Sequence, residues 1–243
     1  MSIRHALVTG ANRGLGLEFV RQLLAARSHV VATCRQPGKA TALNVLAGEH
    51  PGRLHVLPLD VAAPKSQAEL ARELPLVLGE DGRLDLLVNN AGVLHSGERF
   101  GQLTLPNFED SFRINAAGPL LLTQALAPLL ADACPGQGRG GARVLNLSSD
   151  LGSISTITRF GTPSYSMGKA AQNMATVLLA NALADRGIVV AALHPGWVRT
   201  DMGGEGGELE PAEAVAALLR TAAGLEPADS GRFLDRDGGA MSW

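Results

Sequence analysis

Short apolar runs alternate with longer stretches of helical periodicity along the chain, and this alternation constrains the fold more than any other feature of the sequence. It is typical of βαβ units and a parallel sheet. Several runs are apolar throughout, as expected of strands that helices cover on both faces. The predicted strands are Ala6–Thr9, Val30–Cys34, Leu54–Leu59, Leu84–Asn89, Ala142–Leu147, Val189–His194 and Arg232–Leu234.

Helical periodicity is clearest over Leu15–Ala26, Leu105–Leu130 and Ser164–Arg186. A further helix is expected over Pro64–Leu78, where Pro75 should end or kink it near Leu74 because proline lacks the N–H that the helix needs. Pro119 and Pro128, inside the Leu105–Leu130 stretch, indicate a helix that is bent or shorter than its pattern. We therefore predict an α/β fold, a doubly wound parallel sheet of about seven strands, in one domain spanning residues 1–243.

The composition excludes several classes of protein. An apolar content of 46% with 18% charged residues supports a large core. A formal net charge of −2 gives no reason to expect nucleic acid or an anionic membrane as a partner. Cys34 and Cys134 lie far apart, which favours a reduced setting with no structural metal. Without a recognisable signal peptide or membrane span, we expect a cytoplasmic protein.

A glycine-rich turn follows the first predicted strand. Gly10, Gly14 and Gly16 stand between that strand and an amphipathic run that begins at Leu17. Glycines here permit a tight bend and a close approach of backbone to a pyrophosphate, and the helix amino terminus adds N–H donors and positive dipole charge. Glycines also mark turns that bind nothing, so the position after the first strand is what favours a dinucleotide site.

The end of the second predicted strand indicates which dinucleotide is preferred. It carries no acidic residue that would accept hydrogen bonds from an adenosine ribose diol. Arg35 stands there instead, and Arg13 lies in the glycine turn, so both cations suit a ribose 2′-phosphate. Either arginine alone is equally explained as a solvated surface charge. Together they favour NADP(H) over NAD(H).

Tyr165 is the only tyrosine in the chain, and Lys169 follows it by four positions. On a helix these two side chains share a face. A phenol titrates near pH ~10 in water, and a nearby cation lowers that value toward one useful for acid/base chemistry. The competing interpretation is a packed tyrosine with a surface lysine one turn away.

Taken together, these residues resemble the short-chain dehydrogenase/reductase family over essentially the whole chain. The motifs that carry the resemblance are Thr9-Gly10-x-x-x-Gly14-x-Gly16, Leu59-Asp60-Val61, Asn89-Asn90-Ala91-Gly92, Asn115, Ser148-Ser149, Tyr165-x-x-x-Lys169 and Pro195-Gly196. Within the family the chain is most similar to the carbonyl-reductase-like group that includes C-factor and sniffer. The resemblance implies a Rossmann-type fold.

The resemblance also implies a catalytic set. Tyr165 is then the general acid in reduction, Lys169 lowers its pKa and binds the nicotinamide ribose, and Ser149, rather than Ser148, holds the substrate carbonyl oxygen. Asn115 holds a water that passes protons to Lys169. The residues implied to contact the cofactor, besides Tyr165 and Lys169, are Gly10, Asn12, Arg13, Gly14, Leu15, Gly16, Arg35, Asp60, Val61, Asn90, Ala91, Gly92, Pro195, Gly196, Val198 and Thr200.

Some of these positions have a purely structural alternative. Asp60 would contact the adenine amino group but also suits a turn cap, and Asn90 also suits the satisfaction of loop backbone. The loop Gly152–Ser164, between the catalytic serine and tyrosine, is a few residues longer than in many members of the family. His194 is interpreted as structural, since no spacing makes it a metal ligand or a catalytic base.

The expected reaction is hydride transfer from NADPH to the carbonyl of a small hydrophobic aldehyde, ketone or quinone. Candidate pocket residues are Leu94, His95, Leu151, Phe160, Trp197 and Met202. Two alternatives remain: an NAD(P)-binding signalling or regulatory protein of the C-factor kind with incidental turnover, and an enzyme of the same fold that reduces an enoyl group. Because family members commonly pair through the equivalents of the two long helices, a homodimer or homotetramer is expected.

Overall fold

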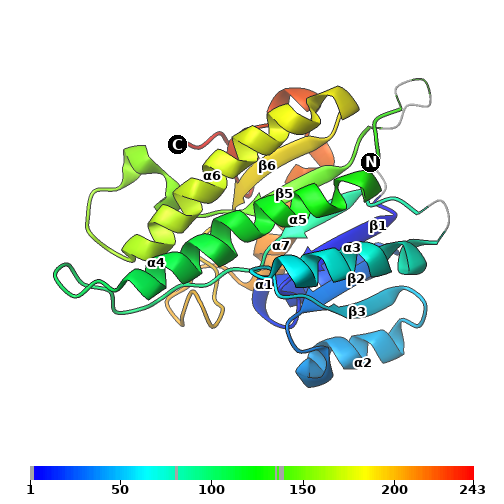
Figure 1. Ribbon diagram of the computed structural model, residues 1–243, viewed down its shortest axis with the longest axis horizontal. Coiled ribbons are helices and arrows are strands. Elements are labelled where there is room, and N and C mark those ends of the chain that lie inside the picture. The colour runs from blue at the N-terminus through cyan, green and yellow to red at the C-terminus, as the bar shows by residue number, and fades with distance from the viewer. Residues whose placement is uncertain (1–2, 80–81, 135, 137–139) are drawn as a thin grey trace.

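The computed structural model describes residues 3–79, 82–134, 136 and 140–243 (Figure 1). Its centre is a sheet of seven parallel strands in the order β3-β2-β1-β4-β5-β6-β7. The strands are β1 (His5–Thr9), β2 (His29–Cys34), β3 (Leu54–Pro58), β4 (Leu86–Asn89), β5 (Arg143–Leu147), β6 (Val189–His194) and β7 (Phe233–Asp235). The predicted doubly wound fold is thereby confirmed.

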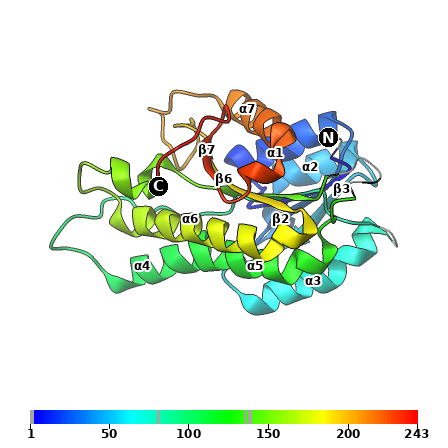
Figure 2. The same ribbon diagram turned by 90° about the horizontal axis from the view of Figure 1, so that it is seen from above.

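Helices cover both faces of the sheet (Figure 2). One layer holds α1 (Gly14–Ala25), α2 (Thr41–Glu49) and α7 (Pro211–Gly224), and the other holds α3 (Pro64–Leu78), α4 (Leu105–Phe112), α5 (Gly118–Leu126) and α6 (Pro163–Leu183). Successive side chains of β1 point to opposite faces of the sheet. Ala6 and Val8 pack in the apolar cluster on one face, and Leu7 packs in the cluster on the other. Apolar residues are therefore required on both faces in the middle of this strand.

The predicted strands match the observed ones within one or two residues at each end. The largest shift is at β4, which begins at Leu86 rather than at Leu84. Leu84 forms only an isolated bridge, with Leu130. The apolar pattern thus located the strands because most of their residues are buried between the layers; only β3, at the edge of the sheet, is mainly half-buried.

The prediction was that Pro75 would end or kink its helix near Leu74, and the helix does not end there, because α3 continues to Leu78. Pro75 lies in the last turn, so the helix loses a single interior hydrogen bond there. Leu74 and Leu78 are both buried in the core, and their packing holds the final turn against the sheet.

The prediction of a bent or shorter helix over Leu105–Leu130 is confirmed. The stretch divides into α4, a π-helical turn over Arg113–Ala117, α5, and a 3₁₀ turn over Ala127–Leu129. A π-helical turn inserts an extra residue into the helical ladder and is often found at functional sites. Here it contains Asn115.

Two helices were not predicted from the sequence, α2 and α7. Both lie in the same layer as α1 (Figure 2). None of the helices in the described part of the chain is both long enough and apolar enough to cross a membrane.

Candidate functional site

A cleft of about 1080 Å³ opens at the carboxyl ends of the strands. Its walls are the segments that follow six of them: 10–15 after β1, 34–39 after β2, 59–61 after β3, 90–94 after β4, 148–151 after β5 and 194–203 after β6. Strands β1 and β4 are neighbours in the sheet, and the strand order reverses between them. In open α/β sheets this reversal point is where ligands bind.

The glycine turn after β1 is packed too tightly for side chains at Gly10 and Gly16. A Cβ on Gly10, where φ is +62°, would lie 2.9 Å from the Ala91 Cα, and one on Gly16 would lie 2.4 Å from the Gly10 carbonyl oxygen. Asn90 fixes the turn from the next strand, since its Nδ2 donates to the carbonyl oxygens of Thr9 at 2.8 Å and Gly10 at 3.2 Å. Gly16 therefore lies behind the cleft wall rather than in it.

Helix α1 begins at Gly14, and Gly14 and Leu15 line the cleft. The amino end of this 12-residue helix therefore meets the cleft. Unpaired N–H groups and the partial positive charge of the helix dipole favour an anionic ligand there.

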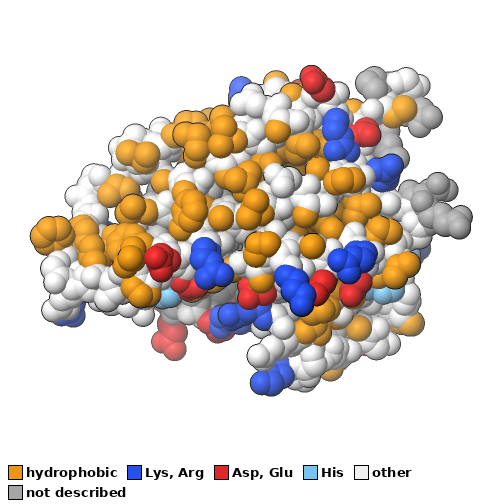
Figure 3. All heavy atoms as spheres, viewed as in Figure 1, with side chains coloured by type: hydrophobic (Ala, Val, Ile, Leu, Met, Phe, Trp, Pro, Cys, Tyr) orange, Lys and Arg blue, Asp and Glu red, His pale blue; other side chains and the backbone are white. Residues whose placement is uncertain are grey.

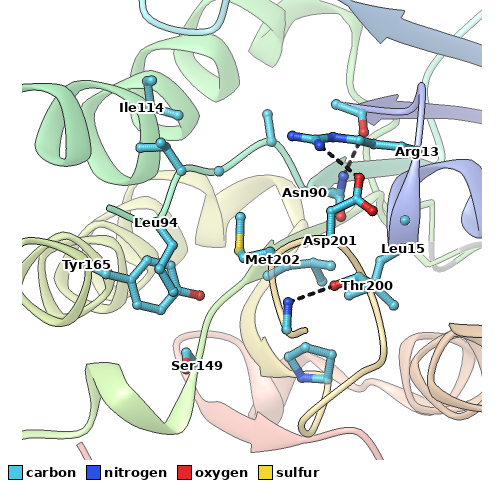
Figure 4. A pocket seen from close by; sticks show the side chains of 18 of the residues that line it. Arg13, Leu15, Asn90, Leu94, Ile114, Ser149, Tyr165, Thr200, Asp201 and Met202 are labelled. Atoms are coloured by element: carbon cyan, nitrogen blue, oxygen red, sulfur yellow. Dashed lines mark hydrogen bonds and ion pairs between the residues drawn. The ribbon is translucent and has the colours of Figure 1, made fainter. Parts of the chain in front are cut away.

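Cations gather where β2 ends. Arg35 and Lys39 line the cleft and are exposed, and neither forms an ion pair with any described residue. Arg13 differs, since its Nη1 lies 2.8 Å from the Asp201 carboxylate (Figure 4). The predicted contact of Arg13 with a ligand phosphate therefore requires that this exposed ion pair open.

Ser149 and Tyr165 approach the cleft from β5 and α6. Because α6 begins at Pro163, Tyr165 lies in its first turn, and only 8% of the residue is exposed. The Ser149 Oγ donates to the Asp150 Oδ1 at 2.9 Å, whereas the Ser148 Oγ turns to the Asn173 Oδ1 at 2.6 Å. The two serines thus have different partners. Figure 4 shows Ser149 and Tyr165 on the side of the cleft away from Arg13.

Lys169 lies one turn after Tyr165 on α6 and is almost fully buried. Its Nζ donates to the Leu147 carbonyl oxygen at 2.6 Å and to the Gln172 Oε1 at 2.9 Å, and lies 5.6 Å from the centroid of the Tyr165 ring. Burial lowers the pKa of Lys169 from 10.5 to about 7.

The pKa of Tyr165 differs from the prediction. Burial raises it from 10.0 to about 12, a hydrogen bond with Ser149 lowers it, and the charge of Asp150 raises it. The predicted lowering by Lys169 is absent because that amine has a depressed pKa of its own and is directed toward Leu147 and Gln172. The phenol is therefore protonated at neutral pH.

Asn115 is buried beside the cleft and does not line it. Its Oδ1 accepts from the Val93 N–H at 2.8 Å, and its Nδ2 donates to the Val93 carbonyl oxygen at 2.9 Å and to the Ser111 Oγ at 2.9 Å. Both ends of the side chain thus hold the segment after β4. The predicted water relay to Lys169 stays a prediction.

Most of the other residues implied by the family resemblance also line the cleft. They are Asn12, Asp60, Val61, Asn90, Ala91, Gly92, Pro195, Gly196, Val198 and Thr200. Asp60 also has the structural role that was its alternative, since its Oδ1 accepts from the Ala62 N–H at 3.0 Å. Both interpretations of Asp60 are compatible with this geometry.

Four of the six candidate pocket residues line the cleft, namely Leu94, Leu151, Trp197 and Met202. The other two do not. The His95 Nε2 lies 3.1 Å from the Asp110 carboxylate, and the Phe160 ring packs edge-on against Phe100. Both contacts hold loops at the rim of the cleft.

Several charged residues of the cleft were missed in the sequence. They are Lys39, Asp110, Asp150, Arg159 and Asp201. Their positions next to strand ends were a usable signal for Lys39, Asp150 and Asp201. Asp110 and Arg159 reach the cleft from α4 and from the loop before α6, and no strand end marks them in the sequence.

His194 has a structural contact, as interpreted from the sequence. Its Nδ1 accepts from the Asp150 N–H at 3.2 Å, and burial lowers its pKa while Asp150 raises it. Among the residues that the structure describes, no cluster of His, Cys, Asp and Glu is arranged to hold a metal ion.

The chain belongs to the short-chain dehydrogenase family, whose model matches residues 4–210. It is 40% identical over 164 residues to C-signal of Myxococcus xanthus, an alignment that covers 67% of this chain and 94% of that protein. Two solved structures resemble it over nearly their whole lengths. They are an NADPH-bound carbonyl reductase from chicken fatty liver (TM-score 0.93, 38% identity, 100% of both chains) and the carbonyl reductase Sniffer of D. melanogaster (TM-score 0.92, 32% identity, 99% of this chain and 100% of the other).

Proposed function

We propose that this protein is an NADPH-dependent carbonyl reductase that acts on small, largely apolar aldehydes, ketones or quinones. The observation that carries the proposal is the meeting of Ser149, Tyr165 and Lys169 at one end of a cleft whose other end is a glycine turn with a helix amino terminus. The likeness to a carbonyl reductase described as NADPH-bound supports both the reaction and the cofactor.

The cleft suits a phosphorylated dinucleotide. Gly10, Gly14 and the start of α1 would hold the pyrophosphate, because no Cβ stands between the backbone N–H groups and the cleft. Arg35 and Lys39 would pair with the ribose 2′-phosphate. Arg13 would also contact this phosphate once its ion pair with Asp201 has broken. Asp60, Val61, Asn90 to Gly92, and Pro195 to Thr200 would line the remainder. When bound, the nicotinamide supplies the hydride.

The protein's own side chains supply the proton and hold the carbonyl. A Tyr165 pKa of about 12 keeps the phenol protonated at neutral pH, the state that a proton donor to the nascent alkoxide needs. Ser149 and Tyr165 would both donate hydrogen bonds to the carbonyl oxygen as negative charge develops on it. Lys169 would hold the nicotinamide ribose. When its amine is protonated, its positive charge would also favour loss of the proton from the Tyr165 phenol.

A second function is carried by one observation. The relative from Myxococcus xanthus is named C-signal, which suggests a signalling or regulatory protein that binds NAD(P) and turns over substrate only incidentally. The presence of Ser149, Tyr165 and Lys169 around one cleft favours the enzyme, since binding alone does not need all three.

NADPH consumption against a panel of aldehydes, ketones and quinones tests the proposal, with NADH and Tyr165→Phe in parallel. We expect turnover with NADPH that falls by roughly 100-fold or more in Tyr165→Phe while NADPH binding is retained. Met167→Leu, an exposed position on the same helix, is the matched control and should keep full activity. Unchanged turnover in Tyr165→Phe contradicts the mechanism. Tight NADPH binding without turnover across the panel favours the signalling function.

We also propose a homodimer or homotetramer assembled through α4, α5 and α6. Large apolar side chains are exposed on these helices, notably Phe112, Leu121, Met167, Met174 and Leu178. Apolar surface is spread over this face of the molecule (Figure 3). Exposed apolar area of this extent commonly marks an interface. Light scattering in solution gives the mass directly, and a monomer at working concentrations would contradict this assembly.

A further inference from the structure

The loop between β5 and α6 carries two charged side chains, Asp150 at its start and Arg159 near its end. Between Asp150 and Lys169, Arg159 is the only charged residue, in a run rich in Ser and Thr. Arg159 nevertheless lines the cleft together with Leu151, Tyr165 and Trp197. An isolated guanidinium therefore stands at the wall that also holds the proposed catalytic tyrosine.

The loop is fastened at several points, so Arg159 is held near this wall. At its start, the Gly152 carbonyl oxygen accepts from the Asn173 Nδ2 of α6 at 3.2 Å. In its middle, the Ser155 Oγ donates to the Trp243 carbonyl oxygen at 2.7 Å. Next to Arg159, the Phe160 ring lies 5.6 Å from that of Phe100, at an interplanar angle of 86°. The loops before α4 and before α6 accordingly lie together at one end of the molecule (Figures 1 and 2).

The charges around Arg159 leave it without a partner. Among the described residues, none forms a hydrogen bond or an ion pair with Arg159. The two carboxylates on the same side of the cleft already have donors: Asp110 has His95 at 3.1 Å, and the Asp150 Oδ1 accepts from the Ser149 Oγ and the Leu151 N–H, each at 2.9 Å. The guanidinium is thus available to a ligand.

Arg159 is separate from the cations that suit the cofactor. Arg35 and Lys39 follow β2, beyond the glycine turn, whereas Arg159 comes from the loop that leads into Tyr165. Figure 4 shows Tyr165 and Leu94 at one end of the cleft and Arg13 with Leu15 at the other. Exposed apolar side chains accompany Arg159: Ile157 and Phe160 lie in the same loop, and Trp197 lines the same cleft.

We propose that Arg159 selects carbonyl substrates that have an apolar body and an anionic group, a carboxylate above all, and holds that group while the carbonyl meets Ser149 and Tyr165. This inference rests on the proposed reductase function and narrows it to a substrate class. A guanidinium presents paired N–H donors that match a carboxylate, which makes arginine more selective here than a point charge.

The test compares kcat/KM for 4-carboxybenzaldehyde with that for 4-methylbenzaldehyde, which is similar in size and uncharged. The ratio of kcat/KM for the charged aldehyde to that for the uncharged one is expected to fall about fivefold in Arg159→Gln. This fall corresponds to the upper end of the free energy that an exposed ion pair contributes. Most of the fall should lie in KM for the charged aldehyde. Arg159→Lys should retain part of the ratio, and added salt should lower the ratio in the native protein but not in Arg159→Gln.

Arg220→Gln is the matched control, because Arg220 is exposed on α7 and does not line the cleft. It should leave the ratio unchanged. An equal ratio in native protein and Arg159→Gln, with 4-methylbenzaldehyde still reduced, overturns the inference and leaves the reductase function standing. Absence of turnover with both aldehydes in the native protein contradicts the proposed function as well.

Discussion

Replacement of Lys169 by methionine should change how the stability of the fold depends on pH. In the folded protein burial lowers the pKa of Lys169 from 10.5 to about 7, because the amine is almost fully removed from water. The unfolded chain still binds this proton up to its ordinary pKa. Above pH 7 the unfolded state therefore holds more protons than the folded one, and the free energy of unfolding rises with pH.

The size of this effect follows from the pKa of about 7. Each pH unit over which only the unfolded lysine is protonated adds about 1.4 kcal/mol. At pH 7 the folded amine is about half protonated, so the gain between pH 7 and pH 9 comes to about 2 kcal/mol. The same stability is lost as the pH falls from 9 to 7. Lys169→Met removes the titrating group and with it this part of the pH dependence.

Urea unfolding at pH 7, 8 and 9 measures the effect in the protein without added NADPH. The difference in free energy of unfolding between native protein and Lys169→Met should grow in favour of the native protein by about 2 kcal/mol over this range. Lys65→Met is the control, because the Lys65 side chain is 90% exposed. Parallel pH profiles for native protein and Lys169→Met would refute the reasoning and show that Lys169 stays charged in the fold.

Two further substitutions test the packing around the site. Gly16→Ala should lower the free energy of unfolding by about 1–3 kcal/mol, since its Cβ would meet the Gly10 carbonyl oxygen at 2.4 Å; Gly48→Ala, with nothing within 4 Å, is its control, and equal effects in urea unfolding would contradict the argument. Glu98→Ala should cost about 0.5–2 kcal/mol, because the Glu98 Oε2 accepts from the Ser164 N–H at 3.2 Å and Oγ at 2.9 Å and so caps α6. If thermal unfolding of Glu98→Ala matches that of the native protein, the cap is not stabilising α6.

The sheet could be predicted from the sequence because most of its strands are covered on both faces. Mostly apolar runs are then expected, and β1, for example, fully buries Ala6, Leu7 and Val8. One of the two missed helices, α2, had no comparable signal. Helix α2 buries a single residue, Leu43, so its sequence shows little periodicity. The pattern over Pro64–Leu78 was recognised, but the effect of Pro75 depends on its place in the last turn and on the burial of Leu78, which the sequence does not show.

The candidate site was predictable where it depends on strand ends. Residues after β1, β4, β5 and β6 meet in one cleft because parallel strands bring their carboxyl ends to one edge. Ion pairs between side chains, and the burial of single side chains, could not be predicted from the positions of strand ends. The pairing of Arg13 with Asp201 joins residues 188 positions apart, and the pKa of Tyr165 depends on burial that a Tyr-x-x-x-Lys spacing cannot show.

The occurrence of a single phenol in the chain, buried in the first turn of α6, makes the protein its own spectroscopic reporter. Ionisation of tyrosine changes the ultraviolet absorption of the ring, and in this chain any such change comes from Tyr165. An alkaline titration therefore follows the protonation of one identified atom without labelling or background subtraction. Isotopically labelled tyrosine would likewise give one magnetic resonance signal, from a residue that lines the cleft, that responds to each ligand bound there.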